Sequence, residues 1–398
     1  MDNVLRRLTF KRNAISLLEI AFLVKYFTSM NSKFILFIMM LSLIACQNKA
    51  LNDLSYSSTA TFEKVADLDV NHTIYGWQGL CSYVDKGGKK YALLNNATHQ
   101  IEIYNDLNDR FTDSVSFKEH FPNMDAWDIA KVNQGWFIRF SIHQNNLKGI
   151  ENTMFIINDN NTVDTINFPS DIFRTKDLEL PVSLARLAIG EEFYPIAQID
   201  SFLLFETVPP ALTSNSLIVK ENDLPMGMIL NTNSGTWKAF PMNYPYLGDK
   251  AMNVETWRAP VTADNEQFYL APKWESTIYT YNPTTEKIDS IERYTDSEIT
   301  PDFSSTTEKY NVSKQSELYG YVIWHNDSLF YDTFELNDST GKRITKMYCK
   351  TKDVYFKVEP WRPVINFIRL HDQLYWRVMA TLEGKDYGLM KVNINAQK

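Results

Sequence analysis

The chain has 398 residues, of which 54 are aromatic (24 Phe, 21 Tyr and 9 Trp), against 14 Gly, 15 Pro and 3 Cys. This composition excludes a disordered chain, a collagen-like repeat and a small disulfide-framed protein. The formal net charge of −8, from 40 basic and 48 acidic residues, has the wrong sign for a nucleic-acid-binding protein. We therefore expect a globular protein with a sizeable apolar core and no nucleic-acid partner.

The N-terminal region has the features of a secretion signal. Residues 33–46 (KFILFIMMLSLIAC) place one Lys before an apolar run of about ten residues, too short to span a bilayer. The run ends in Leu43-Ile44-Ala45-Cys46, which resembles the lipobox of bacterial lipoproteins, whose Cys is acylated. The alternative is a buried strand or helix that ends in a free Cys. We predict lipidation of Cys46, because two or more acyl chains anchor a protein stably.

Translation is expected to begin at Met30, which opens a compact signal peptide. In the upstream residues 1–29, Glu19 and Lys25 interrupt the apolar stretch, which argues against a transmembrane helix. The first 45 residues hold six basic and two acidic residues, so the remainder has 34 basic and 46 acidic residues and a net charge of −12. The predicted organisation is a signal region at 1–45, a polar tether at 46–58 and a folded domain at 59–398.

Beyond the tether, the chain consists of short alternating or aromatic-rich runs separated by Asn, Asp and Gly turns, a pattern typical of β-strands. The runs form a repeat in which a strand ends in Asn and a turn leads to another strand. The two best copies, 91–105 and 268–282, lie 177 residues apart. Six copies, spaced by 53, 73, 51, 55 and 56 residues, end at Asn105, Asn158, Asn231, Asn282, Asn337 and Asn393. A general preference for Asn in hairpins would explain one copy but not the spacing.

A repeat of this length with four strands is typical of a β-propeller blade. We predict an all-β fold, a six-bladed β-propeller, with seven blades as the alternative. Aromatic side chains would fill the space between adjacent twisted blades. In each unit the first two strands would meet at a polar turn, at residues 86–89, 133–135, 200–201, 264–265, 326–327 and 371–372.

The last blade needs a strand from elsewhere in the chain. The sixth copy of the repeat ends almost at the C-terminus, which would leave an open sheet edge. Residues 55–65 (SYSSTATFEKV) precede the first blade and alternate well enough to supply the missing strand. We therefore predict a ring closed by an N-terminal strand. Two polar stretches, 207–224 and 292–318, are expected to be long loops.

The sequence resembles a known family in three features taken together. These are the lipobox, the length of about 350 residues after it, and six degenerate, aromatic-rich blades with Asn at their turns. The family is the uncharacterised lipoproteins of Bacteroidetes with a TolB-like six-bladed propeller domain. The resemblance covers Cys46 to Lys398 and rests on architecture, without a diagnostic catalytic motif. It implies an envelope lipoprotein with no settled activity and transfers no catalytic residue. Since Gln47 stands where Asp would signal inner-membrane retention, we expect an outer-membrane lipoprotein facing either the periplasm or the cell surface.

Motifs for common chemistries are absent from the sequence. It has no Gly-rich phosphate loop, His-Glu-x-x-His or Gly-x-Ser-x-Gly, so nucleotide hydrolysis, zincin proteolysis and α/β-hydrolase chemistry lack local support. The six His are scattered without a second ligand at metal-like spacing, so we expect no metal or other cofactor. Cys81 and Cys349 fall in units that are not neighbours in a six-bladed ring. We expect two buried free thiols.

Two similar segments, 255–260 (ETWRAP) and 359–363 (EPWRP), stand out. Both lie where one blade crosses to the innermost strand of the next, on the face that bears the funnel mouth in propellers. Trp and Arg there would suit an anionic or sugar-like ligand, through stacking and bidentate hydrogen bonds. Alternatively, Trp packs between blades and Arg pairs with nearby acids, purely for cohesion. The predicted ligand-binding set is Trp77, Trp127, Trp257, Arg258, Lys273, Trp274, Trp361 and Arg362, with Asn96, His99 and His143 on the same face.

Three functions remain open. The favoured one is a monomeric, non-catalytic envelope propeller, held to the membrane by its lipid, that binds a protein or a glycan or other anionic ligand at its funnel face. The second is a propeller enzyme of lactonase or glycan-cleaving type, which needs a central metal or a carboxylate pair. The acids available for it are Asp125, Asp128, Glu255 and Glu359. The third is a purely structural envelope component, in which replacing Arg258 and Arg362 would change nothing.

Overall fold

Strands make up the described part of the chain. The computed structural model describes residues 57–67, 79–122, 124, 126–140, 153–167, 186–187, 196–208, 211–213, 216–217, 225–244, 252–253, 259–295, 317–337, 342–351, 354–360, 367–378 and 388–396. All of them belong to the unit Leu54–Lys398. These ranges contain 28 strands and no helix, so none of their segments is a helix that could cross a membrane. The prediction of an all-β protein is confirmed.

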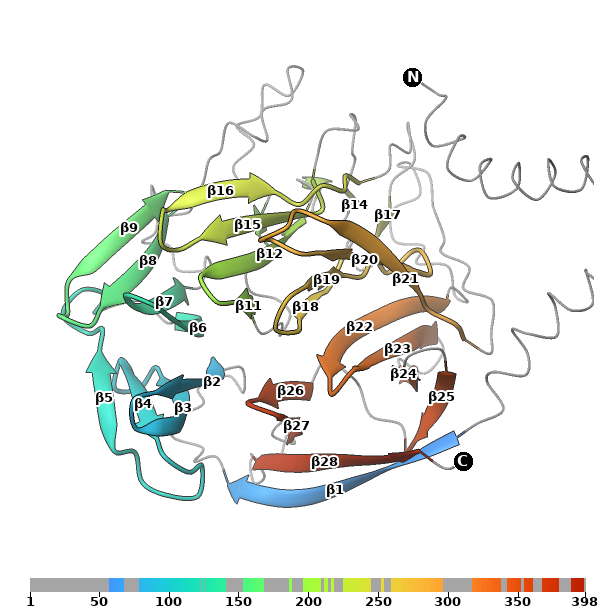
Figure 1. The fold of residues 1–398 in the computed structure, drawn as a ribbon, viewed down its shortest axis with the longest axis horizontal. Coiled ribbons are helices and arrows are strands. Elements are labelled where there is room, and N and C mark those ends of the chain that lie inside the picture. Colours follow the sequence, from blue (N-terminus) through green and yellow to red (C-terminus); the bar gives the residue numbers. More distant parts are fainter. Residues whose placement is uncertain are drawn as a thin grey trace, which may run out of the picture. The chain divides into compact units, whose positions relative to one another are not determined.

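The first four sheets are antiparallel, and the first, second and fourth each consist of four consecutive strands (Figure 1). The first contains β2 (Leu80–Asp85), β3 (Gly88–Asn95), β4 (Gln100–Tyr104) and β5 (Asp113–Ser116). The second contains β6 (Ala126–Val132), β7 (Gly135–Phe140), β8 (Thr153–Asn158) and β9 (Val163–Asn167). The third contains β11 (Ala197–Ile199), β12 (Phe202–Val208), β15 (Gly227–Asn231) and β16 (Thr236–Ala239), with β10 (Arg186–Leu187) also paired to β12. The fourth contains β18 (Val261–Ala263), β19 (Phe268–Leu270), β20 (Thr277–Tyr281) and β21 (Ile288–Glu292).

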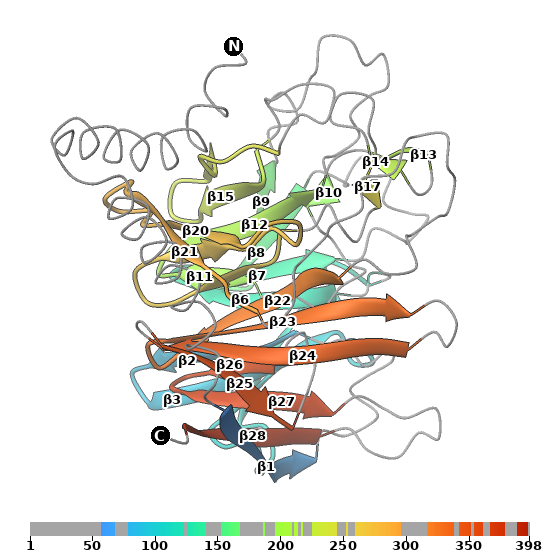
Figure 2. The same ribbon diagram turned by 90° about the vertical axis from the view of Figure 1, so that its right-hand side faces the viewer.

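The remaining large sheet has eight strands and joins the two ends of the unit. Its order is β22 (Glu317–His325), β23 (Ser328–Asn337), β24 (Lys342–Thr351), β25 (Val354–Glu359), β1 (Ser57–Asp67), β28 (Gly388–Ala396), β27 (Gln373–Val378) and β26 (Phe367–Leu370). Figure 2 shows its long strands β23 and β24. β1 runs parallel to β25 only at Ser57–Thr59, but antiparallel to β28 along most of its length, with Phe62 opposite Val392. The strand predicted at 55–65 is therefore present and pairs with the last strand of the chain.

The stretch 207–224, expected to be a loop, contains regular structure. β12 extends into it, and β13 (Ala211–Thr213) and β14 (Ser216–Leu217) form a short hairpin inside it. β14 also pairs with β17 (Met252–Asn253), more than thirty residues further on. The expectation of a loop was wrong here, because the partner that makes these residues strands is remote in sequence.

The Asn residues of the predicted repeat have two different placements. Asn158 and Asn231 end the third strand of their sheets, and Asn105 and Asn282 directly follow it. Their amides hold the turn: Asn282 Oδ1, for example, accepts the Thr285 N–H at 2.8 Å. Asn337 instead ends β23, the second strand of its sheet, and Asn393 lies within β28. The fifth copy was thus assigned to the wrong strand, because β23 and β24 have ten residues each and displace the turn.

The core is divided among the sheets. Among the described residues it forms six hydrophobic clusters. Four lie between sheets that follow one another along the chain, one lies between the two halves of the eight-stranded sheet, and one joins β26–β28 to β2–β4. Aromatic side chains fill these interfaces, as predicted. Phe137 meets Phe205 with ring centroids 5.6 Å apart, and Tyr269 stacks on Trp324 at 4.8 Å and 11°. Small antiparallel sheets packed face to face in chain order are consistent with a propeller fold.

Candidate functional site

The inner strands of the sheets line a cavity of about 720 Å³. The strands β2, β6, β11, β18, β22 and β26 all contribute, and each is the first strand of its sheet or half-sheet. The volume is in the range of small-molecule sites. The lining includes residues of the turns that follow these strands, such as Asp200 and Asp372. The cavity therefore reaches the end of the inner strands that carries the first turns. The sequence analysis had placed the funnel at the opposite end, where one blade crosses to the next.

The turns that follow the inner strands make the rim of the cavity polar, because tight turns favour Asn and Asp. Left-handed backbone conformations occur at Asp200 (φ 48°), Asn326 (φ 48°), Asp327 (φ 55°) and His371 (φ 51°). Tight hairpins need such residues, and apart from Gly it is Asn and Asp that adopt this conformation most readily. The six predicted first turns are all present between their strands. Turn chemistry thus places carboxylates and amides around the cavity mouth.

Most charged groups of the described lining already have partners. Lys89 Nζ lies 2.7 Å from Asp372 Oδ2, and Lys131 Nζ lies 2.9 Å from Asp159 Oδ1. Both pairs are solvent-accessible and contribute little to stability. The charged and titratable lining residues are Asp85, Asp128, Asp200, Asp372, Lys89, Lys131, Arg369, His371, Cys81 and Tyr83.

Asp128, one of the acids proposed for catalysis, lies on β6 and is buried. Its Oδ2 is 3.4 Å from Arg139 Nη2, and its Oδ1 accepts the Ile129 N–H at 2.9 Å. Burial raises the pKa of this carboxyl, while Arg139 and, more weakly, Arg377 oppose the rise. The other proposed acids do not join it among the described residues: Glu359 is exposed at the end of β25, and Asp125 and Glu255 lie outside those residues.

Both described cysteines are free, as predicted, but the expected burial is complete only at Cys349, since Cys81 is half-buried. Burial, with a smaller contribution from Asp128, raises the pKa of Cys81 to about 12. Burial also raises the pKa of Cys349 to about 11. Since the thiolate is the reactive form, Cys81 is a poor nucleophile although it lines the cavity.

Arg369 differs from the other cations of the lining. It lies on β26, is half-buried, and makes no hydrogen bond or ion pair with any described residue. Burial lowers the pKa of its guanidinium, and the nearby Asp264, Asp372 and Tyr269 act in the opposite direction. His325, at the end of β22, lies close enough that the charge of Arg369 helps to lower its pKa, after the larger effect of burial.

The sequence-predicted ligand-binding residues are only partly visible. Lys273 and Trp274 are buried: Lys273 Nζ lies 4.6 Å from the centroid of the Tyr321 ring, and the Trp274 ring 5.6 Å from that of Tyr244. These contacts fit the cohesive role considered as the alternative, and ligand binding by the set stays a prediction. Trp127 lies in β6, but its side chain is outside the described residues, as are Cys46, Trp77, Trp257, Arg258, Trp361 and Arg362.

The loop residues predicted beside that set have structural contacts. Asn96 bridges the first two sheets, because its side chain accepts the Ala126 N–H at 2.9 Å and donates to the Ala126 carbonyl at 2.8 Å. His99 has a left-handed backbone (φ 56°) and its ring packs on Phe117. His143 lies outside the described residues. The sequence analysis did not identify Arg369 as a candidate binding residue. Its position two residues before the predicted first turn at 371–372 could have indicated that it lies on an inner strand.

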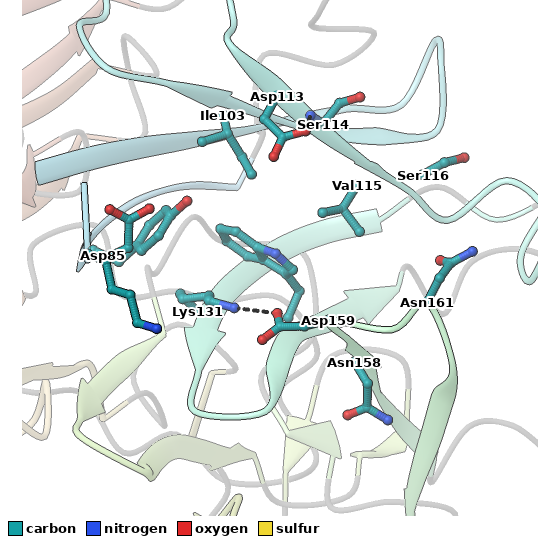
Figure 3. A pocket seen from close by; sticks show the side chains of 13 residues that line it. Asp85, Ile103, Asp113, Ser114, Val115, Ser116, Lys131, Asn158, Asp159 and Asn161 are labelled. Carbon is teal, nitrogen blue, oxygen red and sulfur yellow. Dashed lines mark hydrogen bonds and ion pairs between the residues drawn. The ribbon is translucent and has the colours of Figure 1, made fainter. Parts of the chain in front are cut away.

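A second cavity of about 690 Å³ lies between the first and second sheets (Figure 3). Asp85, Asp113 and Asp159 border it, and Lys131 borders both cavities. Its aromatic groups are packed rather than presented to solvent, since Trp136 is only 2% exposed and lies edge-on to Tyr83. This groove therefore offers carboxylates but no stacking platform.

The comparisons with known proteins concern the fold. No family model and no curated protein matches the sequence. A member of the DUF4221 family from Bacteroides vulgatus has a TM-score of 0.59 and 13% identity, over 85% of this chain and 99% of its own. A candidate exported protein from Bacteroides fragilis has a TM-score of 0.47 and 12% identity, over 87% and 95%. The PQQ-bound aldose sugar dehydrogenase from Streptomyces coelicolor has a TM-score of 0.38 and 10% identity, over 84% and 98%. The chain thus shares its fold with the first of these Bacteroides proteins.

Proposed function

We propose that this protein is a six-bladed propeller that binds a small polar ligand, of glycan or anionic type, without transforming it. Two observations support the blade count: the eight-stranded sheet divides between β25 and β1 into two groups of four, and six core clusters alternate with the sheets. Packing of Leu370 against Leu80 and Leu93 supports closure between the last and first blades.

The observation that carries ligand binding is the cavity enclosed by the six inner strands. Its lining mixes apolar positions with carboxylates, cations and amides, which is the composition of a site that orients a polar molecule by a few hydrogen bonds. The crossover face, with the Trp–Arg segments at 255–260 and 359–363, remains a second proposed contact surface.

The test is a thermal-shift screen of the purified mature protein with D-glucose, maltose, N-acetylglucosamine and D-glucuronate. A ligand at ten times its Kd stabilises the folded state by about 1.4 kcal/mol and so raises Tm measurably. Thr262→Trp would fill the cavity from β18 and abolish the shift, whereas Thr262→Val, of similar volume to Thr, would keep it. Absence of any shift in the wild type, or a shift that survives Thr262→Trp, would contradict the proposal.

We also propose that the protein is anchored by lipid at Cys46 in the outer membrane. The apolar run and tetrapeptide ending at Cys46 carry this proposal. Metabolic labelling with a palmitate analogue should mark the wild type and not Cys46→Ser, and membrane fractionation should find the labelled protein with outer-membrane markers. An unlabelled wild type, or equal labelling of Cys46→Ser, would refute the anchor without bearing on the cavity.

A further inference from the structure

The strongest unexplained feature of the cavity is a cation without a partner. Arg369 projects from an inner strand into the cavity lining, and among the described residues no carboxylate, carbonyl or hydroxyl accepts a hydrogen bond from its guanidinium. A guanidinium carries five N–H donors in a planar fork, so this is a large unused hydrogen-bonding capacity.

The two carboxylates whose charge acts on Arg369 make their hydrogen bonds and ion pairs with other residues. Asp264 Oδ1 accepts the N–H groups of Glu266 and Gln267, both at 2.6 Å, and its Oδ2 accepts the Tyr269 hydroxyl at 2.5 Å. Asp372 is paired with Lys89 at 2.7 Å. Both acids therefore act on Arg369 only through space, and neither occupies its fork.

A second polar group near Arg369 is also unpartnered. His325 is 9% exposed, its buried Nδ1 has no hydrogen-bond partner, and the charge of Arg369 acts on its ring. Beside it, Trp324 and the stacked Tyr269 form a rigid aromatic wall. His325, Trp324 and Tyr269 lie behind the cavity lining, so the fork-shaped cation of Arg369 is the group at the lining that suits a planar or tetrahedral oxyanion.

We propose that Arg369 anchors a small ligand bearing a carboxylate, sulfate or phosphate group in the central cavity. This inference rests on the proposed function and names its ligand class. The protein carries a net negative charge that repels anions in general, so binding of an anion would depend on a local cation such as Arg369.

The test measures Kd by calorimetry for D-glucuronate, inorganic phosphate and inorganic sulfate, with D-glucose as the neutral comparison. Arg369→Gln should weaken anion binding at least about tenfold, the usual effect of losing a charge-assisted hydrogen bond, and leave glucose unaffected. Arg369→Lys should recover part of the affinity, since charge returns without the fork. Lys89→Gln removes the same charge from the same rim and is the matched control, expected to change Kd less than threefold, about what an exposed pair contributes.

The probes also separate a sugar acid from a free anion: glucuronate binding alone indicates an acidic sugar, and phosphate or sulfate binding alone indicates the oxyanion itself. Equal losses in Arg369→Gln and Lys89→Gln would overturn the inference, because a general charge effect would then suffice. Anion binding that Arg369→Gln leaves intact would overturn it as well. If glucose binds, Thr262→Trp blocks it and no anion binds, the inference fails and the cavity proposal stands; if nothing binds the wild type, both fail.

Discussion

The interfaces between sheets and the central cavity use the same strands in opposite ways. In the interfaces, one face of each sheet presents rings and aliphatic chains to the next sheet, as Phe137 does to Phe205. In the cavity, the first strands and their turns present carboxylates, cations and amides. The comparison teaches that cohesion and binding are spatially separated, so a change at an interface should cost stability and a change at the cavity should mainly affect a ligand.

The largest effect is expected at β1, which belongs to the cohesive part of the molecule. Ala60 is 3% exposed and pairs with Ile394, so Ala60→Pro would remove a ladder position and clash within the sheet, at a cost of ~3 kcal/mol or more. Circular dichroism melts of the mature protein would show a strong loss of Tm. Thr61→Val, at the exposed neighbouring position, is the control and should melt like the wild type. Equal melting of all three proteins would show that β1 is dispensable.

The next effect is expected at an aromatic interface. Phe137 is fully buried, and Phe137→Ala would open a cavity between the second and third sheets, which costs ~3–5 kcal/mol. Phe111, 49% exposed, is the matched aromatic on the surface, and Phe111→Ala should change the free energy of unfolding by less than ~0.5 kcal/mol. Denaturant titration measures both. Similar losses would mean that aromatic content, rather than its position between sheets, determines stability.

A smaller effect is expected where the first two sheets approach most closely. A Cβ on Gly79 would lie 2.8 Å from the Ile129 backbone nitrogen and 2.9 Å from Asp128 Cα. Because backbone cannot move aside as a side chain can, Gly79→Ala should destabilise the fold by ~1–3 kcal/mol. Gly87→Ala, where the nearest atom is a side-chain oxygen at 3.2 Å, is the control and should cost less. Indistinguishable unfolding curves for the two variants would contradict this close approach.

The smallest effect is expected at the buried His325, through the dependence of stability on pH. Burial and then the charge of Arg369 lower the pKa of His325, with Asp372 opposing, so the folded state binds its proton less readily than the unfolded chain. The resulting stability is complete above the ordinary His pKa of about 6.5 and is lost as the pH falls toward the folded value. His325→Gln should therefore flatten the decline in Tm from about pH 7 to about pH 5. His120→Gln, at an exposed site, should leave the slope unchanged; a steeper slope in His325→Gln would reverse the assigned direction.

Turns and strands were predictable where local chemistry decides them. Five of the six first turns place Asn, Asp, Gly or His at positive φ, as at Asp200 and His371. In the turn at 264–265 the Asp264 side chain instead accepts the N–H groups of Glu266 and Gln267. The segment at 55–65 was predictable as the partner of the last strand because an unpaired edge demands one. The strand that ends at Asn337 was not predictable. Its sequence fits the second or the third strand of a sheet equally well, and only the pairing of β23 with β24 shows that it is the second.

The sequence by itself determined the strand-rich fold, the aromatic filling between sheets and the sorting of polar residues into turns, because these depend on residue type and spacing along the chain. Only the tertiary structure decided which polar groups converge. Arg369 and His325 come from opposite edge strands of the eight-stranded sheet, and Asp264 follows β18 of the fourth sheet. All three lie at or just before a predicted first turn, but the repeat alone does not show which of these turn residues approach one another. Their meeting at one end of the inner strands depends on how the sheets pack against one another. Asp264 is already held by Tyr269 within its own hairpin, and the packing leaves the guanidinium of Arg369 at the cavity lining.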